Sequence, residues 1–297
     1  MNIEQKLLAW YKKNGRDLPW RKTQDPYKIL VSEIMLQQTQ VARVLLYYKT
    51  WLKQFPNWKT LAAASNADVI KAWAGLGYNR RALVLRDIAR EIASSLRSSQ
   101  RQSSNWLEFK GIGPYTAAAL AIFTGAERIM PIDTNIRRVL DRALLGVPFP
   151  DPKLDDKLKS RTLKLLKTKD FDLVPQALFD LATTICKKVP DCAVCPLRNE
   201  CKSAPRFLAG KVPVLKAMIK KSRETIHRNK KYPDRIYRGR ILTVVREARA
   251  GVTINRLGPM IDPAFDRQSD QAWLLAMIAR MRQDKLLTIK NNRLCLL

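Results

Sequence analysis

A carboxylate in an apolar helix is the first feature of this sequence that could do chemistry. Glu33 lies within a helix predicted over residues 29–48, among mostly apolar neighbours. Burial would raise the pKa of this side chain and leave it protonated, as a general acid requires. Alternatively, Glu33 lies exposed in the first turn of the helix, where Ser32 caps the helix and the helix dipole favours a negative charge. The residues alone leave both interpretations open.

A second carboxylate, Asp133, stands directly before a helix predicted over residues 134–144. Its simplest role is that of an N-cap, which accepts hydrogen bonds from the first backbone N–H groups of the helix. Taken alone, Asp133 would be assigned this structural role. A chemical role becomes worth considering because Asp133 follows the motif described next.

The segment Phe109–Ala117, FKGIGPYTA, has the pattern of a helix-hairpin-helix motif. Two glycines permit a tight turn, and Pro114 suits the first position of the helix that follows. The free N–H groups at the start of that helix can hold a DNA phosphate without reading a base. The candidate phosphate-binding residues are Gly111, Gly113, Tyr115 and Thr116. An ordinary turn between two helices is the alternative.

Four of the five cysteines form the pattern Cys-x5-Cys-x2-Cys-x5-Cys. They are Cys186, Cys192, Cys195 and Cys201. The N-terminus does not resemble a signal peptide and no apolar run is long enough to span a bilayer, so we expect a cytoplasmic protein in which disulfides are rare. Four clustered thiolates suit either an iron–sulfur cluster or a structural zinc ion.

The charge balance indicates a polyanionic partner. There are 55 Lys and Arg against 26 Asp and Glu, a formal net charge of +29. An excess of this size repels itself unless a partner neutralises it, which disfavours a protein whose basic residues are merely solvated. Charge alone does not distinguish DNA or RNA from an anionic membrane surface.

The first 200 residues have the pattern of short amphipathic helices joined by tight turns, without clear alternating strands. Apolar residues three and four apart predict helices over residues 29–48, 83–94, 117–124, 134–144 and 178–185.

The C-terminal part of the chain has a different character. Residues 204–233 are rich in basic residues and interrupted by prolines, which predicts an exposed linker. Helices predicted over 236–248 and 270–286 precede a short hairpin, 287–289 with 294–296, around a polar turn. This order of elements resembles a winged helix.

Three further motifs give the sequence a resemblance to a known family. They are EIMLQQTQV at Glu33–Val41, GRDLPWR at Gly15–Arg21 and WAGLGY at Trp73–Tyr78. Together with the hairpin and Asp133, they resemble the MutY branch of the endonuclease III superfamily, over roughly residues 1–202. The resemblance implies a monofunctional DNA glycosylase in base excision repair, which hydrolyses the N-glycosidic bond of adenine mispaired with 8-oxoguanine or guanine.

The resemblance also implies the architecture. We expect an all-α, two-lobed helix-hairpin-helix glycosylase over residues 1–203, with an iron–sulfur loop. Its helical barrel lobe would cover about 21–130, and its iron–sulfur lobe 1–20 and 131–203. The linker 204–233 and an α+β winged-helix-like module, 234–297, follow. The cysteine positions favour a [4Fe–4S] cluster over zinc, although the first gap is one residue shorter than the six usual in the superfamily.

The catalytic roles carried over from the family fall on four residues. Glu33 would protonate the flipped adenine at N7, and Asp133 would stabilise the oxocarbenium-like sugar. Tyr115 and Asn135 would hydrogen-bond to these carboxylates and orient them. Because strand-cleaving relatives have a lysine at the position of Tyr115, no efficient lyase step is expected.

The remaining site residues implied by the family would hold the DNA. Gln38 and Tyr78 would enter the base stack near the partner base while adenine leaves the helix. The expected partner is double-stranded DNA with a mismatch or an oxidised guanine, bound by a nucleoid-associated monomer. The adenine pocket would be lined by Arg16, Leu18, Trp20 and Leu36.

Two departures from the family keep alternatives open. We find no Phe-Ser-His motif of the Nudix-like domain with which MutY enzymes recognise 8-oxoguanine. The C-terminal module could instead add phosphate contacts, or serve stability or protein docking. The candidate phosphate contacts are Arg238, Arg240, Lys290 and Arg293. The alternative functions are a thymine–guanine mismatch glycosylase and a catalytically silent DNA-binding protein.

Overall fold

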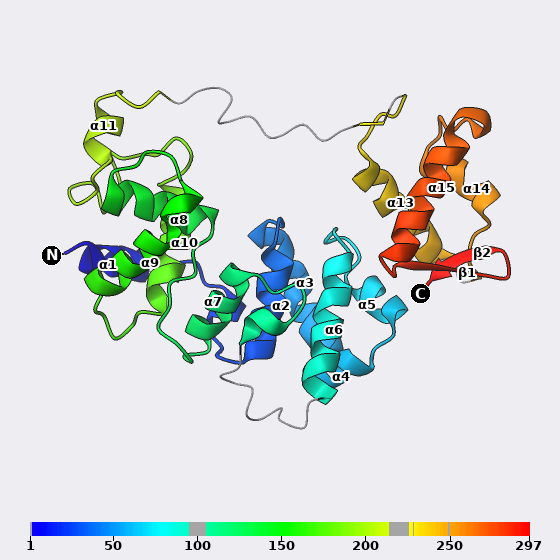
Figure 1. Ribbon diagram of the computed structural model, residues 1–297, viewed down its shortest axis with the longest axis horizontal. Coiled ribbons are helices and arrows are strands. Elements are labelled where there is room, and N and C mark those ends of the chain that lie inside the picture. Colours follow the sequence, from blue (N-terminus) through cyan, green and yellow to red (C-terminus); the bar gives the residue numbers. More distant parts are fainter. Residues whose placement is uncertain (1, 95–104, 214–225, 228, 249) are drawn as a thin grey trace. The chain divides into compact units, whose positions relative to one another are not determined.

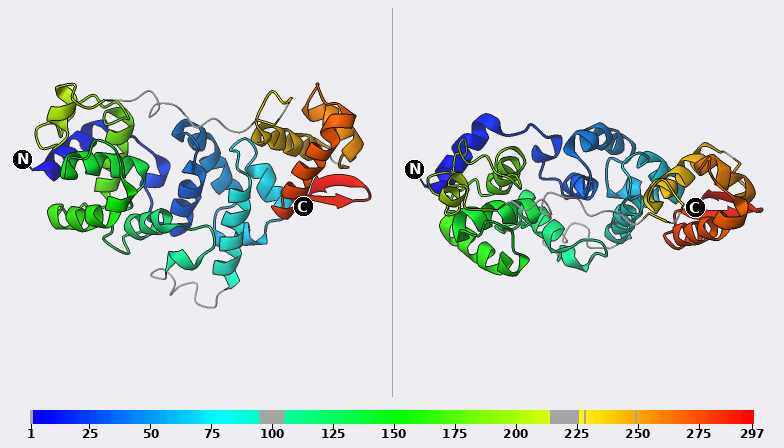
Figure 2. Two further views of the ribbon diagram at one scale, coloured as in Figure 1. Left: turned by 45° about the horizontal axis from the view of Figure 1, so that its top comes forward. Right: turned by 90° about the horizontal axis from the view of Figure 1, so that it is seen from above.

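The structure, a computed structural model, describes residues 2–94, 105–213, 226–227, 229–248 and 250–297. The chain forms two compact units, Met1–Glu33 with Ser99–Lys221, and Ile34–Ser98 with Ser222–Leu297. Both are built mainly of helices (Figures 1 and 2). No helix among the described residues is long and apolar enough to cross a membrane.

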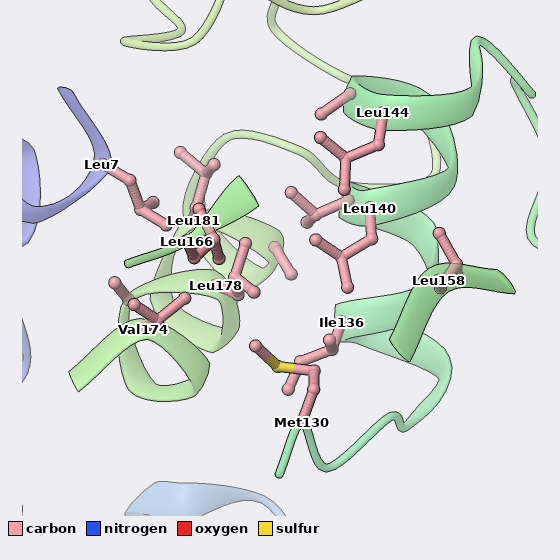
Figure 3. Close-up of a cluster of buried hydrophobic side chains, with 14 of the residues drawn as sticks. Leu7, Met130, Ile136, Leu140, Leu144, Leu158, Leu166, Val174, Leu178 and Leu181 are labelled. Carbon is pink, nitrogen blue, oxygen red and sulfur yellow. The ribbon is translucent and has the colours of Figure 1, made fainter. Parts of the chain in front are cut away.

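The first unit contains an apolar core to which most of its helices contribute. Its helices are α1 (Ile3–Asn14), most of α2 (Pro26–Leu36), α7 (Pro114–Phe123), α8 (Thr134–Leu140), α9 (Asp155–Leu165), α10 (Leu173–Thr184) and α11 (Ala204–Leu208). The centre of the core lies where α8 packs against α10 and α10 against α1. Figure 3 shows Leu140 of α8 and Leu178 of α10 in this cluster, both fully buried. This core fixes the start of α8, which carries Asp133.

The second unit combines helices from two distant parts of the chain. The first group is α3 (Val41–Gln54), α4 (Trp58–Ala63), α5 (Asn66–Ala72) and α6 (Arg80–Ser94). The second is α13 (Asp234–Glu247), α14 (Ile254–Ile261), α15 (Arg267–Gln283), β1 (Leu287–Lys290) and β2 (Arg293–Leu296). In the first group α4 packs along α6, and the rings of Trp51 and Trp73 meet edge to face at 5.3 Å between centroids.

The C-terminal hairpin is confirmed, with strands one residue longer at the turn than predicted. Lys290 pairs with Arg293 across the two-residue turn Asn291-Asn292. Both turn residues have positive φ angles, 47° and 57°, which match the twist of a two-residue hairpin and suit asparagine. Val252 adds an isolated bridge to Leu294, so a third short segment lies beside the hairpin.

The single helix predicted over residues 29–48 is wrong, since α2 and α3 are separate helices. The chain breaks at Gln37–Gln40, where Gln38 takes a left-handed φ of 54°. The four polar residues Gln37–Gln40 interrupt the apolar spacing at this point and were the available signal for the break. The helix predicted over 134–144 is likewise shorter: α8 ends at Leu140, and Asp141–Leu145 forms a wider π-helical turn.

The basic stretch 204–233 contains more order than an exposed linker would. It begins with α11, and Lys230 near its end is buried. The Lys230 ammonium lies 2.9 Å from Asp262 and 2.5 Å from Asp270, and 4.5 Å from the centre of the Trp273 ring. Residues 214–225 lie outside the described residues. Lys230 therefore belongs to the core of the C-terminal elements.

Replacing Lys230 should loosen the C-terminal elements. Lys230→Met would leave two largely buried carboxylates without their counter-ion, which costs about 3–5 kcal/mol in comparable buried pairs. We expect faster hydrogen exchange along α15 than in the parent protein. The matched control is Lys231→Met, at the adjacent exposed lysine. Equal exchange rates in both variants would contradict the assigned role of Lys230.

Candidate active site

Glu33 is buried in the middle of α2. The helix begins at Pro26, two full turns before Glu33, and the Asp25 carboxylate accepts a 2.9 Å hydrogen bond from the Tyr27 amide. The residue is 9% exposed, between the fully buried Ser32 and Ile34. The alternative of a surface glutamate in the first helical turn is therefore wrong.

The surroundings of Glu33 favour its protonated form over the ionised one more strongly than water does. Burial raises the pKa of Glu33 to about 7, and the nearby negative charge of Asp133 adds to the rise. A hydrogen bond from the Tyr115 hydroxyl opposes it. The pKa of Tyr115 is itself raised, first by burial and then by the Glu33 charge, so its hydroxyl stays a donor. Glu33 can thus hold a proton at the pH at which a general acid must deliver it.

Asp133 is both an N-cap and a neighbour of Glu33. Its Oδ1 accepts hydrogen bonds from the amides of Asn135, at 2.8 Å, and Ile136, at 2.7 Å. Its Oδ2 accepts from Asn135 Nδ2 at 2.8 Å. Burial raises the pKa of Asp133, and these hydrogen bonds oppose that rise. The capping role expected from the sequence is confirmed, and it fixes the carboxylate close to Glu33.

Tyr115 and Asn135 are each anchored by a further contact. The Tyr115 ring packs edge to face against Phe179 of α10, with 6.3 Å between centroids. Asn135 Oδ1 accepts a 3.2 Å hydrogen bond from Arg138. Arg138 also donates to the backbone carbonyl oxygen of Cys186, at 2.8 Å. One buried guanidinium therefore joins the first cysteine of the cluster pattern to the residue that holds Asp133.

The two glycines of the hairpin differ in backbone conformation, and only Gly111 has the positive φ typical of a tight turn. Gly111 has a φ of 101°, which only glycine adopts readily. Gly113 is the N-cap of α7 with an ordinary φ of −90°, and a Cβ there would meet no atom within 4 Å. The Thr116 side chain is buried, at 4% exposure, so only its backbone could meet a phosphate.

The segment before α2 holds an ion-pair network that the sequence analysis missed. The fully buried Asp180 of α10 pairs with Arg16, at 2.6 Å, and Arg21, at 2.8 Å. Burial would raise the pKa of Asp180, but the hydrogen bonds and charges of these guanidinium groups outweigh it and leave that pKa lowered. An aspartate inside the apolar pattern of residues 178–185 was the available signal. The guanidinium of Arg16 is therefore already ion-paired with Asp180.

Of the other predicted pocket residues, two are buried and Leu36 is half-buried. Leu18 and Trp20 follow Arg16 and are buried, at 5% and 8% exposure. Leu36 is the last residue of α2, three positions after Glu33, which places both on one face of that helix.

The two residues expected to enter the DNA stack share an unusual backbone. Gln38 is exposed and has a φ of 54°, while Tyr78 is 51% exposed and has a φ of 46°. Non-glycine residues rarely adopt this left-handed conformation. Both side chains therefore project into solvent from strained turns of the second unit.

The four cysteines influence one another electrostatically. Burial raises the pKa of Cys195 to about 12, and the other three thiols of the pattern add to that rise. Thiolates gathered in this way need a cationic partner to be stable. Among the described residues, no group of three or more Cys, His, Asp or Glu side chains has the geometry to hold a metal ion.

Comparisons with known proteins agree with the motifs and the geometry. Residues 31–163 match the model of the HhH-GPD superfamily base excision DNA repair protein. The adenine DNA glycosylase of Mycolicibacterium smegmatis is 36% identical over 273 residues, which cover 90% of this chain and 87% of that protein. The chain belongs to the adenine DNA glycosylase family. The expected resemblance to the MutY branch is confirmed.

Other matches are shorter or more distant. The adenine DNA glycosylase of Mycobacterium tuberculosis is 40% identical over 197 residues, and the match spans 64% of either protein. A solved thermostable thymine-DNA glycosylase has a TM-score of 0.63 over 69% of this chain and 95% of that one, at 24% identity. A solved complex of endonuclease III with DNA has a TM-score of 0.57 at 16% identity. These two structures support the fold alone.

The raised pKa of Glu33 makes the stability of the folded chain depend on pH. The folded protein keeps a proton that the unfolded chain releases between pH of about 4.5 and about 7. Stability should therefore fall as the pH rises through this window, by about 3 kcal/mol. Glu33→Gln removes the titration, so its unfolding free energy relative to the parent should rise with pH. Glu108→Gln, at an exposed carboxylate, is the control; parallel curves for Glu33→Gln and the parent would contradict the shift.

Proposed function

We propose that this protein is a monofunctional DNA glycosylase that hydrolyses the N-glycosidic bond of adenine mispaired with 8-oxoguanine or guanine. The observation that carries the proposal is Glu33, a buried carboxyl group whose pKa is raised to about 7 beside a second carboxylate, Asp133. Such a pair places a proton donor beside a second carboxylate that is held by hydrogen bonds. The family of the chain supports adenine as the base released.

In the proposed reaction Glu33 gives its proton to N7 of the flipped adenine. The electron pair of the C1′–N9 bond then leaves with the protonated base, and positive charge develops on the sugar. The Asp133 carboxylate stabilises that charge in the way paired carboxylates act in glycosidases. Water adds to C1′ and loses a proton, for which the ionised Glu33 is the available base.

Tyr115 and Asn135 act in this proposal by holding the carboxylates. Tyr115 hydrogen-bonds to Glu33, and Asn135 donates to Asp133 at 2.8 Å. A tyrosine has no amine with which to form a Schiff base, so the strand is not cut by an efficient lyase step.

The hairpin and the exposed turns bind the DNA in the same proposal. Gly113 is the N-cap of α7, and without a Cβ its backbone leaves room for a phosphate to approach. The first amides of α7, among them those of Tyr115 and Thr116, lack intrahelical partners and can hold that phosphate. Gln38 and Tyr78 enter the stack. Leu18, Trp20, Leu36 and the accessible part of Arg16 line the adenine pocket.

The cysteine pattern holds a [4Fe–4S] cluster in the proposed enzyme. Burial and the neighbouring thiols raise the pKa of Cys195, and the positive charge of a cluster would offset the cost of its thiolate. Cys186, Cys192, Cys195 and Cys201 would be its ligands. Arg142 donates to the Cys186 sulfur at 3.4 Å and to the carbonyl oxygen of Lys187 at 2.7 Å, which orders the loop. The cluster would serve structure, and zinc is the alternative.

The C-terminal elements form a winged-helix-like module in this proposal. The order α13, Val252, α14, α15 and then the hairpin supports it. Three of the predicted phosphate contacts already have partners within the protein: Arg238 pairs with Asp284, Arg240 donates to Ile261, and Arg293 donates to Gly251. The exposed Lys290 beside the hairpin turn is the better candidate for a DNA contact.

The first experiment measures single-turnover base release from three duplexes, with A opposite 8-oxoguanine, A opposite G, and T opposite G. Adenine release is expected, falling above pH of about 7 as Glu33 loses its proton. Untreated samples should contain intact strands, and alkali should reveal abasic sites. Release of thymine would instead support a thymine–guanine mismatch glycosylase.

Glu33→Gln should lower the rate of adenine release by at least about a hundredfold, the scale of general acid catalysis, while duplex affinity is retained. Glu108→Gln is the matched control at an exposed carboxylate. Equal loss of binding and of rate would contradict the assigned role of Glu33. Tight binding by the parent without release would indicate a silent DNA-binding protein.

The metal content of the purified protein tests the proposed cluster at the four cysteines. The purified protein should be brown, with broad visible absorbance and with iron on elemental analysis. Cys195→Ser should remove the absorbance and the iron together. Colourless protein that carries zinc would overturn the iron–sulfur assignment.

A further inference from the structure

Arg81 lies at the start of α6, and its side chain reaches two separate turns of the second unit. Its guanidinium donates to the carbonyl oxygens of Ile34, at 2.9 Å, Met35, at 3.1 Å, and Gln37. It also donates to Thr39 Oγ1 at 3.1 Å. These acceptors are the end of α2 and the turn that carries Gln38.

The same guanidinium holds the other turn. It donates to the carbonyl oxygens of Leu76, at 3.3 Å, and Gly77, at 3.1 Å. Its central carbon lies 5.3 Å from the ring centre of Trp73 and 5.5 Å from that of Tyr78. Trp73 in turn donates to the Gly77 carbonyl oxygen at 3.0 Å. Tyr78 is therefore fixed from the backbone and from the face of its ring.

Both turns need an anchor because both contain a strained residue. Gln38 and Tyr78 have left-handed φ angles, which are unfavourable for residues that carry a side chain. Such residues persist only where the surrounding structure over-determines them. The carbonyl oxygens at the end of α2 also lack intrahelical donors and favour a cation.

From these contacts we infer that Arg81 is the positioning residue that sets Gln38 and Tyr78 together, as one rigid pair, for entry into the DNA stack. The inference rests on the proposed function, which gives these two side chains that role. A lysine cannot replace Arg81, since a point charge with three donors does not match six acceptors spread over a planar fork.

The alternative role for a basic side chain beside DNA is a phosphate contact. If Arg81 were a phosphate contact, its removal would lower the salt dependence of duplex binding, and a lysine at this position would largely restore the contact. If Arg81 is a positioning residue, its removal would instead loosen both turns in the free protein. The two roles are therefore distinguishable without any measurement of base release.

The first test is hydrogen exchange of the free protein. The amide of Thr39 donates to Leu36, and that of Leu76 donates to Trp73, so each reports on one turn. In Arg81→Met and in Arg81→Lys both amides should exchange at least about tenfold faster. The matched control is Arg90→Met, because Arg90 also lies on α6 and donates to carbonyl oxygens, those of Ala62 and Ala64. Unchanged exchange in either turn of the Arg81 variants would overturn the inference.

The second test is a double-mutant cycle on adenine release. Arg81→Met alone should slow single-turnover release by about tenfold to a hundredfold, as misplaced groups do. In a Gln38→Ala/Tyr78→Ala background the same change should have an effect below about twofold, because the residues it positions are gone. An undiminished effect in that background would contradict positioning.

The cycle also separates this inference from the proposed function. If Gln38→Ala/Tyr78→Ala releases adenine at the parent rate, the role of these two side chains in the DNA stack is wrong, whatever Arg81 does. If that variant is slow and both turns keep their exchange rates in Arg81→Met, the stack role stands and the role of Arg81 is wrong. Arg81→Lys supplies the same readouts should Arg81→Met fail to fold.

Discussion

The removal of one carboxyl group from water is the constraint on which the site depends. Glu33 lies in an apolar helix where an ionised side chain would be poorly solvated, and its pKa is raised to about 7. The same burial that destabilises the anion keeps a proton available at neutral pH. Burying a second ionised carboxylate close to Glu33 would normally cost as much free energy as burying the first. Asp133 is tolerated because backbone amides and Asn135 bind its oxygens directly.

The first unit can be understood as the support of this pair. The core where α8 packs on α10 fixes the helix start that Asp133 caps, and Phe179 of α10 holds the Tyr115 ring. Arg138 extends the support to the cysteine loop through Asn135 and the Cys186 carbonyl oxygen. In the second unit Arg81 has a comparable task at the two strained turns. In both units an arginine side chain connects loop segments to helices, since one guanidinium can donate to several oxygen atoms at once.

Much of the site could be predicted because local patterns define it. The glycines of the hairpin, the aspartate before α8 and the cysteine spacing are all signals within a few residues of one another. The single helix predicted over 29–48 was wrong because the four polar residues 37–40, which interrupt the apolar spacing, form a turn. In that turn Gln38 takes a left-handed φ and divides α2 from α3. Lys230 was assigned to an exposed linker because its two aspartate partners lie 32 and 40 residues further along the chain.

The sequence by itself determined which groups are present and, through its motifs, the family to which the chain belongs. Only the tertiary structure decided the state of those groups. Whether Glu33 is an acid or a surface anion depends on what surrounds α2, and Tyr115 and Asp133 come from 82 and 100 positions away along the chain. Arg16 and its ion-pair partner Asp180 are 164 positions apart along the chain. Arg81 donates a hydrogen bond to Ile34, which lies 47 positions away. Dielectric environment and hydrogen-bond partners are properties of the folded neighbourhood, and no local pattern of residues encodes them.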